Sequence, residues 1–334
     1  MKVAVLGAGQ WGTALAQVLC DAGNDVLIWG RNSAVVTEIN SIHKNSKSLG
    51  VHQLPDQLRA TTSIMDAINH AEALVLAIPA QSLRANLQEW KGLISKEIPI
   101  ISSLKGIELE THQRMSEVIH QALGTPLDQI AIVTGPNLAK EVVMRQPAGA
   151  VAASRSQTLA EKTAKLFGNS YFRVYTSNDV IGCELAAAAK NVIALAVGIS
   201  IGMGYGENTQ ALVITRGLNE LTRLGMARGA EPMTFVGLAG VGDLLATCGS
   251  PLSRNRSFGE ILGKSGSMER ASAEVKSTVE GVATASAITE LARSHSIEVP
   301  IMTAVAAVVR NTITPEQAMI GLMKINTGAE INHQ

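Results

Sequence analysis

Residues 3–12 read Val-Ala-Val-Leu-Gly-Ala-Gly-Gln-Trp-Gly, and this stretch decides the fold of the first half of the chain. The apolar run at 3–6 predicts a buried strand, and the Gly-x-Gly-x-x-Gly pattern follows it directly and opens a helical segment at 11–22. In such a turn Gly7 permits the tight bend, Gly9 lets the backbone approach a pyrophosphate, and Gly12 lets the helix pack against the strand. A tight turn without a ligand has the same pattern, but its place between strand and helix favours dinucleotide binding.

The end of the second expected strand, at 26–29, bears on the choice of cofactor. NAD-preferring sites usually carry an acidic residue there, whereas this chain reads Trp29-Gly30-Arg31-Asn32. Arg31 cannot accept a hydrogen bond from a ribose hydroxyl, but its guanidinium can pair with a 2′-phosphate or stack on adenine. We therefore expect NADP(H) to be favoured, or at least admitted beside NAD(H). The alternative is a surface arginine without a ligand.

Strands and helices alternate beyond this unit. Short β-branched runs predict strands at 3–6, 26–29, 74–78, 98–102, 130–133 and 148–152, with a last one at 171–175. Helical spacing recurs between several of them, at 11–22, 34–42, 82–94 and 112–123. This alternation predicts a doubly wound, mainly parallel sheet of the Rossmann type. From Asp179 onward the pattern is helical, so we expect a Rossmann domain at 1–178 and an all-helical substrate-binding domain at 179–334.

Composition excludes several classes of function. Lys plus Arg and Asp plus Glu both number 28, and the 4 Phe, 3 Trp and 3 Tyr are too few for stacking platforms, so we expect no nucleic-acid partner. The three cysteines, at positions 20, 183 and 248, lack the spacing of a metal site or a redox pair. We therefore expect no metal and a reducing environment.

The apolar segments do not predict a membrane protein. The longest conspicuous uncharged stretch, 191–206, has 16 residues and is interrupted by glycines, which is short for a bilayer. The glycine turn begins at Gly7 and leaves no room for a signal peptide before it. We expect a cytoplasmic protein without a membrane span, and the apolar helical half suggests a homodimer.

Lys190 lies in the middle of a helical segment that is apolar nearly all round, 184–197. Its neighbours at helical spacing include no carboxylate on an adjacent turn. Burial without a partner disfavours the ammonium form, and such a lysine is a candidate proton donor at a carbonyl carbon. The alternative is a lysine whose stem crosses apolar surface and whose ammonium reaches water, and this segment alone leaves both open.

Further polar groups follow other predicted elements. Lys105 follows the apolar run 98–104, and the run 134–141 follows the next strand; the carboxyl ends of such strands are where open sheets bind ligands. In the second half, three glycines precede Asp243, with Thr247 one helical turn later, and the run Ser253-Arg254-Asn255-Arg256 can hold a phosphate. Ordinary loop chemistry or a helix cap explains each of these patterns equally well alone. Glu280 precedes a helix expected over 282–293. Its carboxylate can stabilise the start of that helix, which the local sequence favours, or accept a hydrogen bond from a cofactor amide or ribose.

Taken together, these residues closely resemble the bacterial NAD(P)-dependent glycerol-3-phosphate dehydrogenases. The resemblance covers nearly the whole chain and rests on GAGQWGTALA at 7–16, LIWGR at 27–31, SLKG at 103–106, TGPNLAKE at 134–141, AKNVIALAVG at 189–198, GLAGVGDLLATC at 237–248, SRNR at 253–256 and VEG at 279–281. It implies reversible reduction of dihydroxyacetone phosphate to sn-glycerol 3-phosphate with NAD(P)H, which feeds glycerophospholipid synthesis.

The resemblance also implies roles for residues. Lys190 matches the catalytic lysine. The substrate-binding set is Lys105, Gly135, Asn137, Lys190, Asp243, Thr247, Ser253, Arg254 and Asn255. The cofactor-binding set is Gly7, Gly9, Gln10, Trp11, Gly12, Arg31, Lys105, Ala139, Arg254 and Glu280.

Two rival functions fit the same architecture. A dehydrogenase for a 2-hydroxy acid or a ketopantoate-like compound would use Arg254 and Asn255 to clamp a carboxylate. A redox-sensing regulator would bind the dinucleotide without catalysis, but it has no need of a desolvated proton donor such as Lys190.

Overall fold

The computed structural model describes residues 1–276 and 278–325. Its centre is a single eight-stranded sheet with the order β3-β2-β1-β4-β5-β6-β7-β8. Neighbouring strands are parallel except for the antiparallel pair β6 and β7. The strands are β1 (Lys2–Leu6), β2 (Asp25–Trp29), β3 (Arg59–Thr61), β4 (Ala73–Leu76), β5 (Ile100–Ser102), β6 (Ile130–Thr134), β7 (Ala148–Ser154) and β8 (Phe172–Ser177).

Helices cover both faces of this sheet, as a doubly wound fold requires. One core cluster joins the sheet to α1 (Gln10–Asp21), α2 (Ser33–Ile42), α7 (Ala139–Val143) and α8 (Gln157–Phe167). A second cluster joins the other face to α4 (Ile64–His70), α5 (Leu83–Trp90) and α6 (Met115–Leu123). Short elements connect them: α3 (Ser46–Leu49), η1 (Ala80–Ser82) and η2 (Leu127–Gln129).

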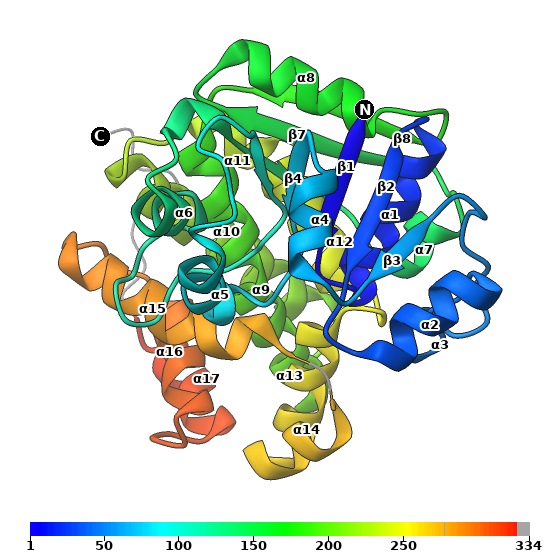
Figure 1. Cartoon of the computed structure of the whole chain (residues 1–334). Helices are drawn as coiled ribbons and strands as arrows, with labels where there is room; N and C mark the ends of the chain where they lie inside the picture. Colours follow the sequence, from blue (N-terminus) through cyan, green and yellow to red (C-terminus); the bar gives the residue numbers. More distant parts are fainter. Residues whose placement is uncertain (277, 326–334) are drawn as a thin grey trace.

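The rest of the described chain is helical and packs around α9 (Val180–Gly202). The other elements are α10 (Glu207–Ala227), α11 (Pro232–Val236), η3 (Leu238–Gly242), α12 (Asp243–Gly249), α13 (Arg254–Ser265), α14 (Met268–Glu274), α15 (Glu280–Ser294), α16 (Pro300–Val309) and α17 (Pro315–Met323). Helices α13 to α17 gather beyond the end of the sheet opposite the N terminus, toward which β1 runs (Figure 1). The predicted fold class, a Rossmann-type sheet followed by a helical region, is confirmed.

The transition between the two halves is short. Strand β8 ends at Ser177, and α9 begins at Val180 with the Asp179 carboxylate accepting a hydrogen bond from the Gly182 amide (2.8 Å). The same carboxylate also accepts from the Glu231 amide and the Thr234 hydroxyl, which ties α11 to this corner. Asp179 is thus the N-cap of α9.

Helices α9 and α13 touch through their backbones. A Cβ added at Gly198 would lie 2.1 Å from the Arg256 carbonyl oxygen, and one added at Gly263 would lie 2.2 Å from that of Ile199. Only glycine permits so close an approach. This contact fixes the start of α13, which carries Arg254, relative to the helix that carries Lys190.

Helix α9 is longer than the uncharged stretch predicts. It has 23 residues and a mean hydropathy of 1.7 in its most apolar window, so by length and composition it passes the test for a membrane-spanning helix. Of that window, 83% is buried inside the protein, which makes α9 the core of the helical half.

Several element boundaries differ from the predictions. Strand β5 begins at Ile100, not 98, because Pro99 has no amide hydrogen to give to a ladder. Strand β3 was not predicted, since its three residues, Arg-Ala-Thr, carry too little apolar pattern at the sheet edge. Helix α6 begins at Met115 because His112 has a left-handed backbone (φ 57°).

Candidate active site

The glycine turn between β1 and α1 has the construction that its spacing predicts. Gly7 has a φ of +129°, and a Cβ there would lie 2.4 Å from the Ala77 carbonyl oxygen. A Cβ on Gly12 would lie 1.8 Å from the Gly7 carbonyl oxygen, whereas one on Gly9 would meet nothing within 4 Å. Gly7 and Gly12 therefore serve the packing, and Gly9 leaves its backbone open to a ligand.

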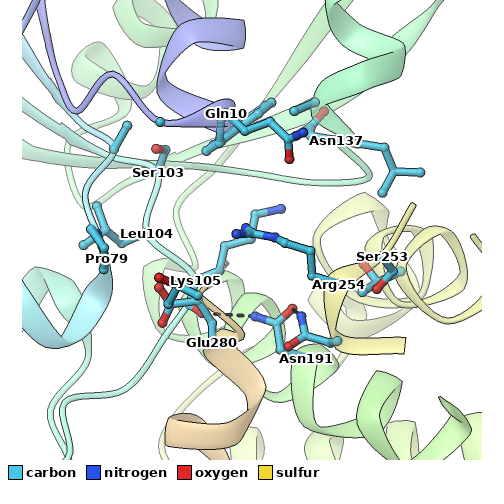
Figure 2. Close-up of a pocket in the computed structure, with 18 of the residues that line it drawn as sticks. Gln10, Pro79, Ser103, Leu104, Lys105, Asn137, Asn191, Ser253, Arg254 and Glu280 are labelled. Carbon is cyan, nitrogen blue, oxygen red and sulfur yellow. Dashed lines mark hydrogen bonds between the residues drawn. The ribbon is translucent and has the colours of Figure 1, made fainter. Parts of the chain in front are cut away.

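A cavity of about 310 Å³ runs from this turn to the helical half (Figure 2). Its walls come from the carboxyl ends of strands and from the starts of α1, α7, α13 and α15. The lining residues are Gly9, Gln10, Trp11, Ala77, Ile78, Pro79, Ser103, Leu104, Lys105, Asn137, Leu138, Ala139, Lys190, Asn191, Thr247, Leu252, Ser253, Arg254, Asn255, Thr278 and Glu280. The structure thus brings most of the predicted site residues to one place.

Two lysines share one buried carboxylate at this cavity. The Lys190 Nζ lies 2.5 Å from Asp243 Oδ1, and the Lys105 Nζ lies 2.8 Å from Asp243 Oδ2. Lys190 also donates to Thr247 Oγ1 (2.7 Å), and Lys105 donates to the Gly135 carbonyl (3.0 Å). Asp243 and Thr247 stand one turn apart on α12, as their spacing predicts.

Of the two alternatives for Lys190, a buried lysine without a partner and one whose ammonium reaches water, the structure shows the buried lysine, but it has a partner. The residue is only 5% exposed, so its ammonium is buried at the wall of the cavity and does not lie on the outer surface of the protein. Its partner comes from α12, 53 residues away, and not from its own helix. Helical spacing identifies only carboxylates on the same helix, whereas the contact between Lys190 and Asp243 is made by tertiary packing.

Burial and the neighbouring charges shift the pKa values of Lys190 and Asp243 in opposite directions. Burial lowers the pKa of Lys190 to about 8, although the attraction of Asp243 opposes that shift. Burial raises the pKa of Asp243, but Lys105 and Lys190 together outweigh it and hold that pKa below its ordinary value. At neutral pH the Lys190 ammonium therefore faces an ionised Asp243 carboxylate.

Each ammonium retains one hydrogen for a ligand. A lysine ammonium has three N–H donors, and the contacts above use two on Lys190 and two on Lys105. Both lysines line the cavity. Their remaining donors suit an oxygen atom that becomes negatively charged.

Arg254 and Glu280 bring further charge to the cavity. Figure 2 shows the Arg254 side chain between Gln10 and Asn137 on one side and Glu280 with Lys105 on the other. Burial lowers the pKa of Arg254 and raises that of Glu280, and their mutual attraction opposes both shifts. Glu280 Oε1 accepts a hydrogen bond from the Ala80 amide (3.4 Å), and Glu280 is the first residue of α15, two residues before the predicted start of that helix.

A chain of amides links the segments around the cavity. Asn191 Nδ2 donates to the Lys105 carbonyl (3.1 Å), and Asn255 Nδ2 donates to Asn191 Oδ1 (2.9 Å). Asn255 Oδ1 in turn accepts from the Gly281 amide (2.9 Å). Asn255 was expected to hold substrate, and the structure shows its amide engaged in this link. Asn191 was not predicted as a site residue. The sequence feature that could have identified it is its place beside Lys190, as a second polar residue in an apolar helix.

Other predicted residues at the cavity have buried polar atoms without hydrogen-bond partners. Within the described part of the chain, both side-chain polar atoms of Asn137 and the Trp11 Nε1 are buried without a hydrogen-bond partner. Buried groups in that state suit a bound ligand. Ser253 lines the cavity while its hydroxyl caps α13, accepting from the Arg256 amide (3.3 Å).

Arg31 lies outside the cavity walls. It lies two residues after the end of β2, beside the glycine turn, where the Gly7 amide donates to the Trp29 carbonyl (3.0 Å). Its side chain is exposed. In the described residues, no three His, Cys, Asp or Glu side chains gather as metal ligands.

A Rossmann-type sheet with this glycine turn, and a buried lysine at the far end of the same cavity, define the class of NAD(P)-dependent oxidoreductases. Comparison with known proteins narrows the class. Residues 2–160 match the N-terminal part of NAD-dependent glycerol-3-phosphate dehydrogenase, and residues 179–320 match its C-terminal part.

Individual proteins similar to this chain over nearly its whole length support the same family. The chain is 48% identical to a glycerol-3-phosphate dehydrogenase [NAD(P)+] of Streptomyces griseus, covering 97% of this chain and 96% of that one, and 47% identical to one of Corynebacterium jeikeium, covering 99% and 100%. The crystal structure of a glycerol-3-phosphate dehydrogenase from Coxiella burnetii superposes with a TM-score of 0.91 at 33% identity, covering 96% and 98%. The chain belongs to the NAD(P)-dependent glycerol-3-phosphate dehydrogenase family.

Proposed function

We propose that the protein reduces dihydroxyacetone phosphate reversibly to sn-glycerol 3-phosphate with NAD(P)H, which supplies the backbone of glycerophospholipids. One observation carries the proposal: the paired lysines on Asp243 and the open Gly9 backbone belong to one cavity. A proton donor and a dinucleotide-binding turn within one cavity suit reduction of a ketone.

The dinucleotide supplies the hydride when bound, and the protein handles the proton and the charge. Lys190 donates a proton to the carbonyl oxygen as the carbonyl carbon is reduced, which leaves a neutral amine that regains a proton from solvent. The remaining N–H of Lys105 stabilises the negative charge on that oxygen. Asp243 and Thr247 hold the Lys190 amine in place.

The residues present fit such a cofactor. Gly9 has no neighbour within 4 Å of the position of a Cβ, and Trp11 has an unpaired buried ring nitrogen. We propose the same cofactor-binding residues as the resemblance implies. Arg31, exposed beside the turn, would meet a 2′-phosphate, so we propose NADP(H) as well as NAD(H).

The substrate phosphate would bind at the start of α13. Arg254 lies there with its guanidinium at the cavity, and the first amides of this 12-residue helix favour an anion. Ser253 and the unpaired amide group of Asn137 complete the proposed contacts, with Gly135 positioned through its bond to Lys105.

The test compares substrates by the loss of NADPH absorbance. We expect dihydroxyacetone phosphate to be reduced with a kcat/KM at least about a hundredfold above that of dihydroxyacetone, because charged phosphate contacts are lost in the latter. No preference for the phosphate would favour a 2-hydroxy acid or ketopantoate-like substrate instead. Failure to oxidise bound NADPH with any ketone in a single turnover would favour a redox sensor.

We also propose a domain division, a cellular location and an oligomeric state. The chain divides near residue 178 into a dinucleotide-binding and a substrate-binding domain, which is supported by the change from sheet to helix between Ser177 and Val180. It acts in the cytoplasm, as its three free, buried cysteines suggest. Exposed apolar side chains such as Met226 and Met233 on the helical half favour a homodimer, which sedimentation would test.

A further inference from the structure

Asn45 is a fully buried polar residue that belongs to none of the roles assigned above. It lies on the loop between α2 and α3, more than thirty residues from the glycine turn in sequence, and its exposed fraction is 0%. Its Nδ2 donates to the Ala8 carbonyl oxygen (3.0 Å) and to the Thr13 hydroxyl (2.8 Å). Both partners belong to the glycine turn and the first turn of α1.

The bond to Ala8 determines which way one peptide plane of the turn faces. In a trans peptide the C=O of one residue and the N–H of the next point in opposite directions. Because Asn45 holds the Ala8 carbonyl on its own side, the Gly9 N–H is directed to the other side. Gly9 lines the cavity and is the N-cap residue of α1, which has no side-chain capping hydrogen bond.

A second contact fastens the same loop to the same helix start. Gln10 Nε2 donates to the Ser48 carbonyl (3.1 Å) in α3. The loop is itself held, since the Asn45 carbonyl accepts the amides of Ser48 and Leu49. The donor that Asn45 offers to Ala8 is therefore fixed in position rather than free to follow the turn.

We propose that Asn45 is a positioning residue for cofactor binding: it orients the Ala8–Gly9 peptide so that the Gly9 N–H faces the dinucleotide pyrophosphate. This inference rests on the proposed function of the glycine turn. It assigns to Asn45 no contact with cofactor or substrate, and no part in the proton transfer at Lys190.

Asn45→Asp tests the proposal with almost no change in shape, because it replaces the donating NH₂ by an oxygen that repels the Ala8 carbonyl. We expect the Kd for NADPH, from equilibrium titration, to rise about tenfold or more. The kcat at saturating NADPH and the KM for dihydroxyacetone phosphate should stay within about twofold, since the lysine cluster is untouched.

Asn40→Asp is the matched control. Asn40 is more exposed, but its Nδ2 also donates to a backbone carbonyl, that of Ala60 (2.9 Å), and its Oδ1 accepts from the Ala60 amide (2.8 Å), at β3 and away from the turn. Both variants should lower the unfolding midpoint, and only Asn45→Asp should weaken NADPH binding. A Kd unchanged in Asn45→Asp, or raised equally in both, would overturn the proposal.

Thr13→Val provides a second measurement if Asn45→Asp does not fold. It removes the other acceptor of Asn45 and loosens its hold on Ala8, so we expect the Kd for NADPH to rise about threefold with kcat unchanged. An unchanged Kd would count against the proposal. Absence of NADPH binding in the unmodified protein would instead refute the function of the glycine turn, and so separates the two failures.

Discussion

The glycine turn and the lysine cluster contribute to one cavity, yet the chain builds them differently. The turn is a single stretch of six residues whose geometry depends on backbone and on the absence of Cβ atoms. The cluster joins side chains 138 and 53 residues apart, and it depends on charge pairing away from water. The comparison teaches that binding the cofactor is a local property of this sequence, whereas proton transfer depends on the whole tertiary structure.

The largest expected effect falls on the lysine cluster. Asp243→Asn leaves the buried Lys190 and the half-buried Lys105 without their carboxylate, so we expect kcat to fall about a thousandfold and the free energy of unfolding to fall by about 3 kcal/mol. Steady-state kinetics and urea unfolding measure the two effects.

Asp179→Asn is the control for that change, because Asp179 is also a buried carboxylate but pairs only with amides and a hydroxyl outside the cavity. We expect it to lower stability and leave kcat within about threefold. An equal loss of kcat in both variants would remove the distinction between the cluster and the general packing of the helical half.

The second prediction separates the glycines of the turn. Gly12→Ala places a Cβ 1.8 Å from the Gly7 carbonyl oxygen, so we expect a loss of about 3 kcal/mol in the free energy of unfolding. Gly9→Ala meets no atom within 4 Å, and its backbone (φ −78°, ψ −176°) suits alanine, so stability should hold while the Kd for NADPH rises about thirtyfold. The reverse pattern would show that Gly9 serves packing and not the ligand.

The third prediction concerns pH and belongs to the cluster alone. The pKa of Lys190 is about 8, and reduction needs its ammonium form, so log kcat/KM for reduction should be level just below pH 8 and fall about one unit per pH unit above it. Oxidation of glycerol 3-phosphate needs the neutral amine, so its kcat/KM should rise toward a plateau above pH 8. Cofactor Kd should show no such break near pH 8. Parallel profiles in the two directions would contradict the assignment of the proton to Lys190.

The smallest expected effect is on the choice between cofactors. Arg31 is exposed, so the loss of its charge in Arg31→Asp should lower kcat/KM with NADPH about fivefold and leave that with NADH within about twofold. Equal losses with both cofactors would remove Arg31 from this role.

The sequence predicts the glycine turn and the mainly parallel sheet, because each depends on a local pattern of apolar and glycine residues. For Lys190 the local pattern leaves open whether the ammonium is buried or reaches water. The sequence does not predict strand β3, which has three residues and little apolar character. Nor does it predict the pairing of Lys190 with Asp243, the amide link through Asn191, or the hold of Asn45 on Ala8. These contacts depend on the packing of segments far apart in the chain, and no periodicity in one segment carries that information.

The most direct test of the central claim is the rate of NADPH oxidation by dihydroxyacetone phosphate in Lys190→Ala, with the Kd of NADPH measured on the same sample. The account predicts normal NADPH binding and turnover reduced by about a thousandfold or more. Turnover at the parent rate with both ligands bound normally would show that Lys190 is not the proton donor.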